Sequence, residues 1–203
     1  MASTLVFKVD ATAPQPVMTD VVTAKNVTTL VGTSEANSTV TVYDGKTAVG
    51  TVQADASGNW TLKAANAAGN IHSYTESATD LAGNIGQSAG VTLFSPSAHQ
   101  NMNGGTGNDV LIAGPNDNLI GGGGNDSFVF NPGSGKDVIT DFSLNLDTLN
   151  FSHTLFTNAQ QAIAHTHDVN GNAVITIDAA DSVTLLGVTT AQLTAHLSDF
   201  HFF

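Results

Sequence analysis

The chain has 203 residues, of which 17 are acidic and only five are basic, so its net charge is −12 with neutral histidines. The five basic residues are all lysines, and with so negative a net charge the chain is poorly suited to bind nucleic acid. Because cysteine is absent, a disulfide framework and a thiolate metal site are both excluded. No apolar run approaches the length of a membrane span, and no basic segment followed by an apolar stretch marks an N-terminal export signal.

Residues 1–95 carry the pattern of an all-β module. Seven short segments alternate between apolar and polar residues, as half-buried strands do; they span 17–22, 28–32, 39–43, 48–54, 60–64, 72–79 and 87–94. Turn signals such as Asp44-Gly45 separate these segments. Strands of this number and spacing predict an immunoglobulin-like β-sandwich, with Trp60 as an anchor of its core.

Four stretches of this module resemble the bacterial Ig-like repeats of large surface adhesins; they span residues 10–14, 38–45, 55–60 and 78–84. Some members of that family bind calcium at the linker between domains. The resemblance therefore implies Asp10, Asp80 and Asn84 as candidate ligands, against the plainer interpretation that they are solvated turn residues. Residues 4–10 resemble the closing strand of a preceding repeat, which predicts that the chain is part of a longer protein.

A repeat of glycine and aspartate follows a polar linker at residues 96–103 and occupies residues 104–129. Asp109, Asp117 and Asp126 recur at spacings of eight and nine, and each is followed two residues later by a large apolar side chain. Glycines allow positive φ, so consecutive carbonyl oxygens can turn toward one point and, with the aspartate, suit a cation that prefers oxygen ligands. The repeat predicts a cation site and a thin core of stacked short strands.

This pattern resembles the RTX repeat, G-G-x-G-x-D-x-U-x, of bacterial proteins exported by type I secretion. In that family two nonapeptides form one coil of a parallel β-roll, and calcium lies between the loops of successive coils. The resemblance implies one site shared by Asp109 and Asp126, and it places Asp117 at the opposite edge. The carbonyl groups implied for the shared site are those near Gly105, Gly107, Gly122 and Gly124.

An altered copy of the repeat lies at residues 132–140 and contains Asp137. By the resemblance, Asp137 completes the edge that Asp117 begins. The segments that start at Asp141 and Asp147 resemble the signatures that close RTX β-rolls. Asp141 is therefore a further ligand candidate, and Asp147 is another.

The alternative for this region is a flexible, acidic linker rich in glycine. Five aspartates are each followed by an apolar residue two positions later, and this phase argues against a linker. We therefore expect the β-roll to span residues 104–151.

Residues 152–203 predict a small C-terminal cap. Capping-box patterns at residues 157–160 and 189–192 each predict the start of a short helix, and alternating segments at residues 173–177 and 182–186 predict a hairpin. The last residues, acidic and then apolar, resemble the uncleaved signals of type I secretion. The region is thus expected to act both as a cap and as a secretion signal.

These features predict an all-β chain with an Ig-like β-sandwich, a parallel RTX β-roll and a small cap of helix and hairpin. The implied function is that of a calcium-binding structural and secretion module at the C-terminus of a large extracellular bacterial RTX adhesin, secreted or on the cell surface. Its implied partners are Ca²⁺ ions and the type I secretion ABC transporter complex.

No catalytic motif occurs in the sequence, so we expect that the chain itself is not an enzyme. Two alternatives remain for the function. The chain could be the calcium-binding tail of a secreted protease, lipase or polysaccharide-active enzyme, or a module whose sandwich binds a glycan or a host surface.

Overall fold

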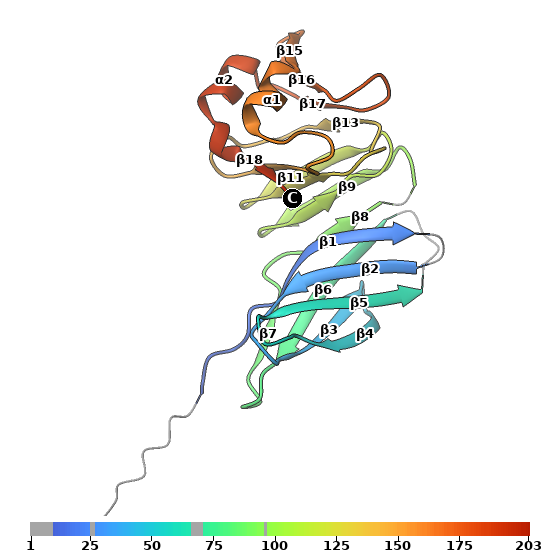
Figure 1. The fold of residues 1–203 in the computed structure, drawn as a ribbon, viewed down its shortest axis with the longest axis vertical. Coiled ribbons are helices and arrows are strands. Elements are labelled where there is room, and N and C mark those ends of the chain that lie inside the picture. Colours follow the sequence, from blue (N-terminus) through green and yellow to red (C-terminus); the bar gives the residue numbers. More distant parts are fainter. Residues whose placement is uncertain (1–9, 25–26, 66–70, 96) are drawn as a thin grey trace, which may run out of the picture.

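The computed structural model describes residues 10–24, 27–65, 71–95 and 97–203, and most of its regular elements are β-strands. The strands form three sheets and the two α-helices among these residues are short, which confirms the predicted all-β class with a sandwich and a parallel roll (Figure 1). Residues 4–9, expected to close a preceding repeat, lie outside the described residues. Within the described ranges, no helix is long and apolar enough to cross a membrane.

The N-terminal half is a sandwich of two antiparallel layers. One layer has the order β1-β2-β5; its strands are β1 (Val17–Ala24), β2 (Val27–Thr33) and β5 (Asn59–Ala65). The facing layer contains β3 (Thr39–Asp44), β4 (Thr47–Gln53), β6 (His72–Thr79), β7 (Ile85–Gln87) and β8 (Thr92–Phe94). In this layer β3 pairs with β4 and with β6, and β6 also pairs with β7 and with β8. Trp60 is 2% exposed and lies in the core, as predicted.

The prediction of a single strand at residues 87–94 is wrong, because this stretch contains the end of β7 and the whole of β8, with a break between them. The Ser88 amide still donates to the Glu76 carbonyl of β6 at 2.8 Å. The Val91 amide instead donates to the Asp109 carboxylate of the roll at 2.9 Å. Strand β8 then begins at Thr92 and pairs with β6 again. The other expected strands of the sandwich agree with the structure within two residues at each end.

The C-terminal half is a roll whose chain alternates between two sheets of parallel strands. One sheet has the order β8-β10-β12-β14-β18; its roll strands are β10 (Val110–Ile112), β12 (Ser127–Phe130), β14 (Thr148–Phe151) and β18 (Phe200–Phe202). The other has the order β9-β11-β13-β17; its strands are β9 (Asn101–Thr106), β11 (Asn118–Gly123), β13 (Lys136–Ile139) and β17 (Ser182–Leu185).

The linker expected at residues 96–103 is wrong at its C-terminal end, where β9 has already begun. Met102 is fully buried and pairs with Leu119 of β11 in the parallel ladder. The buried methionine side chain stabilises β9, although the asparagines on either side of it give the segment the composition of a loop.

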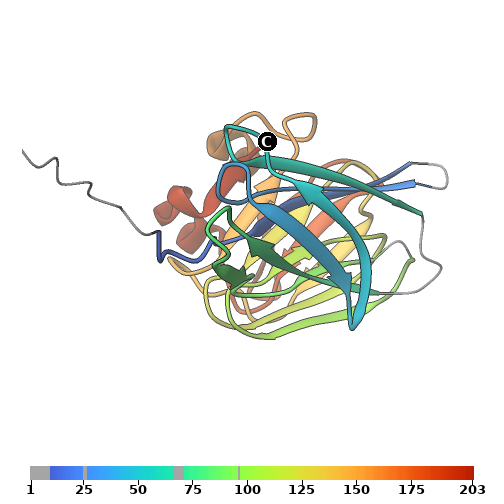
Figure 2. The same cartoon turned by 90° about the horizontal axis from the view of Figure 1, so that it is seen from below.

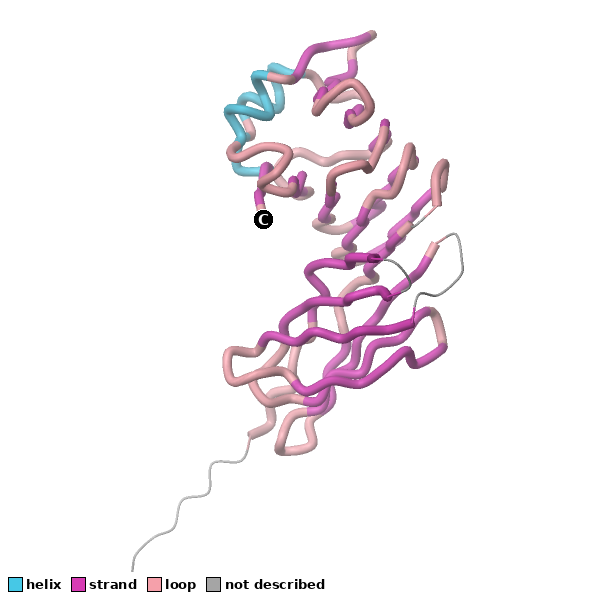
Figure 3. Tube along the Cα trace, turned by 45° about the vertical axis from the view of Figure 1, so that its right-hand side comes forward, coloured by secondary structure: helices cyan, strands magenta, loops and turns pink. Residues whose placement is uncertain are grey.

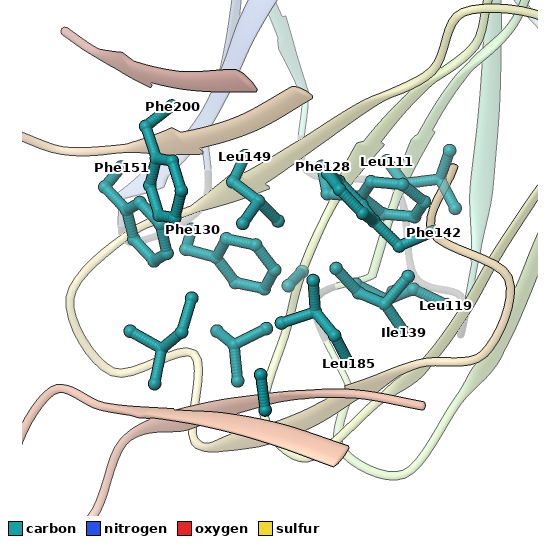
Figure 4. Packing of buried hydrophobic residues seen from close by; sticks show 14 of the residues in the cluster. Leu111, Leu119, Phe128, Phe130, Ile139, Phe142, Leu149, Phe151, Leu185 and Phe200 are labelled. Carbon is teal, nitrogen blue, oxygen red and sulfur yellow. The ribbon is translucent and has the colours of Figure 1, made fainter. Parts of the chain in front are cut away.

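The roll has one apolar core, formed where inward side chains of its two sheets meet (Figure 4). Leu111, Phe128 and Leu149 come from one sheet, Leu119 and Ile139 come from the other, and all five are fully buried. Each strand is so short that it supplies only one or two inward side chains. Because a single coil buries little apolar area, its stability depends on the coils stacked on either side.

The two halves are joined by a continuous sheet and by a shared core. Strand β8 pairs antiparallel with β6 of the sandwich and parallel with β10 of the roll. Ile112 and Val129 face out of the roll and are buried in the same core as Met18 and Val21 of the sandwich. Viewed from below, the sandwich strands lie in front of the roll (Figure 2). The roll is thus stacked on the end of the sandwich.

Residues after β14 cover the end of the roll that is remote from the sandwich (Figure 3). They form α1 (Ala159–Ala164), β15 (Thr166–Val169), β16 (Asn172–Thr176), β17, α2 (Thr190–Ala195), a 3-10 turn (Leu197–Asp199) and β18. The predicted hairpin is confirmed as the antiparallel pair β16 and β17. Strands β17 and β18 also pair in parallel with β13 and β14, so this region adds a further coil to the roll.

The two capping predictions have different outcomes. Helix α2 has the predicted capping box, in which Thr189 is the N-cap and Gln192 is its partner. The prediction for α1 is wrong by one residue, because the N-cap is Asn158, whose side chain accepts the Gln161 amide at 2.9 Å. Thr157 instead donates its amide and hydroxyl to the Gln161 side chain.

Candidate metal centre

One edge of the roll carries a row of aspartates, because stacked parallel strands all begin at the same edge. Asp109, Asp126 and Asp147 immediately precede β10, β12 and β14, and we call them the first ladder. The Asp109 amide donates to Asp126 Oδ1 and the Asp126 amide donates to Asp147 Oδ1, both at 2.9 Å. The Val91 amide donates in the same way to Asp109 Oδ1 at 2.9 Å. One oxygen of each carboxylate is therefore bonded to the preceding coil.

The opposite edge carries a second ladder, made of Asp117, Asp137 and Asp181 at the start of β11, β13 and β17. The Asp117 amide donates to Asp137 Oδ1 at 2.8 Å, and the Gln100 amide donates to Asp117 Oδ1 at 2.7 Å. The structure thus brings the predicted aspartates together in the two expected groups, one on each edge. Their role as metal ligands stays a prediction.

Three ladder carboxylates each have a second oxygen that is buried and has no hydrogen-bond partner within the described part of the chain; the oxygens are Oδ2 of Asp109, Asp126 and Asp137. Each of these residues is only 1% exposed. A buried charged oxygen without a partner costs on the order of 1–3 kcal/mol or more. Each position is therefore electrostatically incomplete and suits a positively charged group.

The glycine turns beside the first ladder pack main-chain carbonyl oxygens closely against the glycines of the next coil. Gly105, Gly107, Gly122 and Gly124 have φ values of 99°, 121°, 97° and 141°, which side chains rarely adopt. The carbonyl oxygens of Gly105 and Gly107 lie so close to Gly122 and Gly124 that a Cβ atom there would collide with them. A Cβ on Gly121 would collide with Asp126 Oδ2. Carbonyl and carboxylate oxygens packed in this way form the donor set that hard divalent cations prefer.

Asp141 reaches the same edge from the chain after β13. Its two oxygens accept the amides of Gly121 at 3.0 Å and Gly122 at 2.8 Å. Asp147 is similar, because its Oδ2 accepts the Ser143 amide at 2.7 Å while its Oδ1 belongs to the first ladder. Both candidate ligands therefore lie at the edge of the first ladder, to which the sequence had not assigned them, and both accept amides of the turns there.

Two acidic residues of the edges were missed by the sequence prediction. Asp181 accepts the amides of Gly133 and Gly135, both at 2.9 Å. Asp199 directly precedes β18 and accepts the Asn145 amide at 3.1 Å. Neither follows a glycine-rich loop, so the repeat pattern does not reach them. The signal available for Asp181 was the apolar residue two positions later.

The ladders raise the pKa of several carboxyl groups. Burial raises the pKa of Asp137 to about 7. The Asp117 amide and the nearby Ser134 hydroxyl act to lower it, although the Ser134 contact does not meet hydrogen-bond geometry, and the charges of Asp117 and Asp181 add to the rise. Burial also raises the pKa of Asp126 and Asp147, with further contributions from neighbouring carboxylates. These directions show carboxylates held without a positive charge beside them, and a bound divalent cation would reverse them.

A separate acidic cluster lies at the far end of the sandwich. Carboxylate oxygens of Asp10, Glu35 and Asp80 all lie within 4.8 Å of one another. The Asn84 side-chain amide donates to Asp80 Oδ2 at 2.7 Å and to the Asp10 carbonyl at 3.1 Å. The structure thus brings the three predicted residues together and adds Glu35, which belongs to no motif. Asp80 Oδ1 accepts amides of its own turn, as the alternative of a turn residue expects.

Two family models match the chain. The one described as "Peptidase M10 serralysin C terminal" matches residues 54–201. The one described as "Bacterial Ig-like domain" matches residues 5–94. The two matches overlap over residues 54–94, the stretch that ends in β8, which is the strand common to both halves.

A comparison with curated proteins found no match. Among solved structures, the extracellular lipase LipA from Serratia marcescens is similar, with 17% sequence identity and a TM-score of 0.41. The similarity covers 89% of this chain and 30% of the lipase chain, so this chain spans less than a third of that protein's length.

Proposed function

The chain belongs to the family of peptidase M10 serralysin C-terminal domains, whose model covers most of it, and on this premise we propose that it is a calcium-binding module at the C-terminal end of a secreted bacterial protein. The observation that carries the proposal is the set of buried oxygens without partners on Asp109, Asp126 and Asp137. Ca²⁺ takes about six to eight oxygen ligands in flexible geometry, and it suits a mixture of carboxylates and main-chain carbonyls.

The two edges of the roll offer separate sites. At the first edge, Asp109 and Asp126 would hold an ion together with the carbonyl oxygens of the glycine turns described above. At the second edge, Asp117 and Asp137 would hold another. Bound Ca²⁺ supplies the positive charge that offsets the repulsion between stacked carboxylates. The ladder bonds through Oδ1 fix one oxygen of each carboxylate, so Asp109, Asp126 and Asp137 keep Oδ2 as the oxygen that an ion would bind.

Calcium and folding would then be coupled. Ordering glycine-rich turns costs much backbone entropy, and clustered carboxylates repel one another, so the calcium-free roll should be largely unfolded. A cytosol poor in free calcium would keep the chain threadable, and millimolar calcium outside would fold it. The type I secretion ABC transporter complex would be the export partner, with residues 152–203 as the segment that it recognises.

The role of the parent protein is proposed from the N-terminal half. The match to a bacterial Ig-like domain supports a large surface adhesin with further repeats before this one. The description of the C-terminal family supports the alternative of a secreted enzyme's tail. The sequence encoded upstream of this chain distinguishes between these two parent proteins. Further Ig-like repeats there would support the adhesin, and a catalytic domain would support the enzyme.

Calcium titration of the full chain by calorimetry tests the binding proposal. Asp126→Asn and Asp137→Asn should each lower the number of bound ions or weaken one class of site, because each removes charge from one edge. Asp55→Asn is the matched control, since it removes one charge from a sandwich turn and keeps an oxygen acceptor for the amides of Ser57 and Asn59. Unchanged titrations of both ladder variants would refute the assignment of the sites.

Export has its own test. Residues 145–203 fused to an unfolded passenger should send the passenger to the medium in a host with a matching type I transporter. The control is the same passenger fused to residues 10–65 of the sandwich, which should remain inside. Retention of the first fusion would show that this segment is not the export signal.

A further inference from the structure

A cavity of about 350 Å³ lies where the sandwich meets the first coil of the roll. Its walls are the start of β1, the side chain of Glu76 from β6, residues 88–92, and the residues around the starts of β10 and β12. Val17, Ala89, Asn108 and Asn125 line it and are themselves exposed, so the cavity opens to solvent.

Glu76 is the unusual residue of this cavity. The alternation of β6 turns it toward the interior together with Tyr74 and Ala78, and it is only 3% exposed. Its Oε1 has no hydrogen-bond partner among the described residues. Burial raises the pKa of this carboxyl group to about 7, against a smaller lowering by the Ser88 hydroxyl. A carboxyl group buried in this way costs stability unless something pairs with it.

Nothing that lines the cavity can supply the missing positive charge. Its lining residues include no lysine, arginine or histidine. The second carboxylate in the lining, Asp109, adds negative charge, but its free oxygen lies against Gly104 in the turn of the metal centre. Glu76 Oε1 is therefore an acceptor without a partner at the wall of this cavity, and because it is buried, the carboxylate has to turn toward the cavity to meet a ligand.

The rest of the lining is mixed. Asn108, Asn125 and Ser127 carry side-chain oxygens, the ligand type that a bare Ca²⁺ ion prefers. Val17, Met18 and Val110 form an apolar part of the wall, with which a bare ion makes no favourable contact. The volume lies in the range of about 300–1,000 Å³ that small-molecule sites occupy. A ligand with one charged end and an apolar stem fits both the carboxylate and these walls.

We propose that this cavity binds a primary ammonium or guanidinium group carried on a short apolar stem. The charged group pairs with Glu76, and the stem packs against Val17, Met18 and Val110. Two sources share this chemistry, a free alkylamine and a lysine or arginine side chain of another protein. The site differs from the calcium sites proposed above in its acceptor, Glu76, which is not a ladder oxygen, but it needs the folded roll, whose residues form part of its wall.

The full chain, saturated with calcium, is titrated with n-butylammonium and with 1-butanol, and amide chemical shifts are followed by NMR. Butylammonium should shift the amides of Glu76, Ser88 and Val110, and butanol should bind at least tenfold more weakly. Glu76→Gln should weaken butylammonium binding about tenfold or more, since a charge-assisted bond is lost. Val17→Ala should weaken butylammonium more than methylammonium, because only the longer probe contacts that wall.

A short peptide with one central lysine separates the two sources. Tighter binding of the peptide than of butylammonium would assign the site to a side chain of a protein partner, and the reverse would assign it to free amines. Calcium titration and circular dichroism of each variant check its fold, and Asp55→Asn controls for loss of charge. Equal binding to Glu76→Gln and to the unchanged chain, equal binding of butanol, or no binding of either cationic probe would overturn the proposal.

Discussion

The sandwich and the roll of this chain fill their interiors with different chemistry. The sandwich joins two layers through apolar side chains such as Leu30, Val40 and Trp60, and its buried acidic residues are Glu76 and Asp80. The roll has a thinner core and buries seven aspartates along its edges. Burial of apolar side chains is enough to stabilise the sandwich. The roll is expected to need bound cations from solution to offset the charge of its buried aspartates.

The two halves differ in chemistry but are not separate in structure. Strand β8 belongs to the sheet of each half. The outward side chains of β10 and β12 complete the core of the sandwich. Loss of the roll should therefore weaken the sandwich without unfolding it completely, and the following experiments measure how far this coupling extends.

Removal of calcium should have the largest effect. With a site constant of about 0.1 mM and about 10 mM Ca²⁺, each site contributes roughly 2.7 kcal/mol by mass action. A chelator should therefore abolish most of the far-ultraviolet signal of the roll in circular dichroism of the full chain. The emission of Trp60 should shift less, because this side chain lies in the sandwich core. Identical folded spectra with and without chelator would contradict the proposed coupling.

Two adjacent residues on opposite faces of β10 measure the coupling directly. Leu111 points into the roll core and Ile112 points into the sandwich core. Leu111→Ala and Ile112→Ala should each cost about 2–5 kcal/mol, but in different halves. Urea unfolding followed by Trp60 emission should change more for Ile112→Ala, and calcium affinity should change more for Leu111→Ala. Equal effects on both signals would mean that the chain unfolds as one unit.

Two glycines of one strand separate the metal site from general backbone effects. A Cβ on Gly121 would collide with Asp126 Oδ2, whereas a Cβ on Gly123 meets open space, and neither has a left-handed φ. Gly121→Ala should weaken calcium binding about tenfold or more, because it displaces a proposed ligand. Gly123→Ala should bind nearly as the unchanged chain does. Calorimetric titration of both variants makes the comparison, and equal losses would count against the site.

The smallest expected effect is on pH dependence without calcium. The folded pKa of Asp137 is raised from 3.8 to about 7, so the folded roll holds this proton more tightly than the unfolded chain does. Any stability of the calcium-free roll should therefore fall as pH rises from about 4 to about 7, and should be level above that.

Circular dichroism in calcium-free buffer at pH 5 and pH 8 measures this fall as a smaller fraction of folded roll at pH 8. Asp137→Asn should make the fall smaller, because the amide does not titrate. Saturating calcium should reverse the trend, since the ion binds the ionised carboxylate. A fall of the same size in Asp137→Asn would assign it to other groups.

The sequence predicted the elements of both halves because their signals are local. Alternation marked the sandwich strands, the spacing of Asp109, Asp117 and Asp126 marked the repeat, and the resemblance to the RTX repeat assigned these residues and Asp137 to the edges where the structure has them. These signals depend on residues two to nine positions apart, which a single sequence displays directly.

The contacts between distant segments were not predictable in this way. The pairing of β8 with β10 follows from the packing of the whole roll on the sandwich, and residues 87–94 by themselves indicate only an ordinary edge strand. Asp181 and Asp199 reach the edges through the fold of the cap and have no glycine turn of their own. Glu35 and Glu76 are single acidic residues in unremarkable segments, and only the fold shows what surrounds them.

The sheet that runs through both halves also has a consequence for aggregation. If the chain were cleaved after Phe94 and lost the sandwich, the amides and carbonyls of β10 that now pair with β8 would form an open edge. Ile112 and Val129 would become an apolar surface beside that edge. An unpaired strand next to exposed apolar side chains is a template for the addition of further strands. The sandwich therefore keeps the roll from self-association, and a roll released from it should form oligomers.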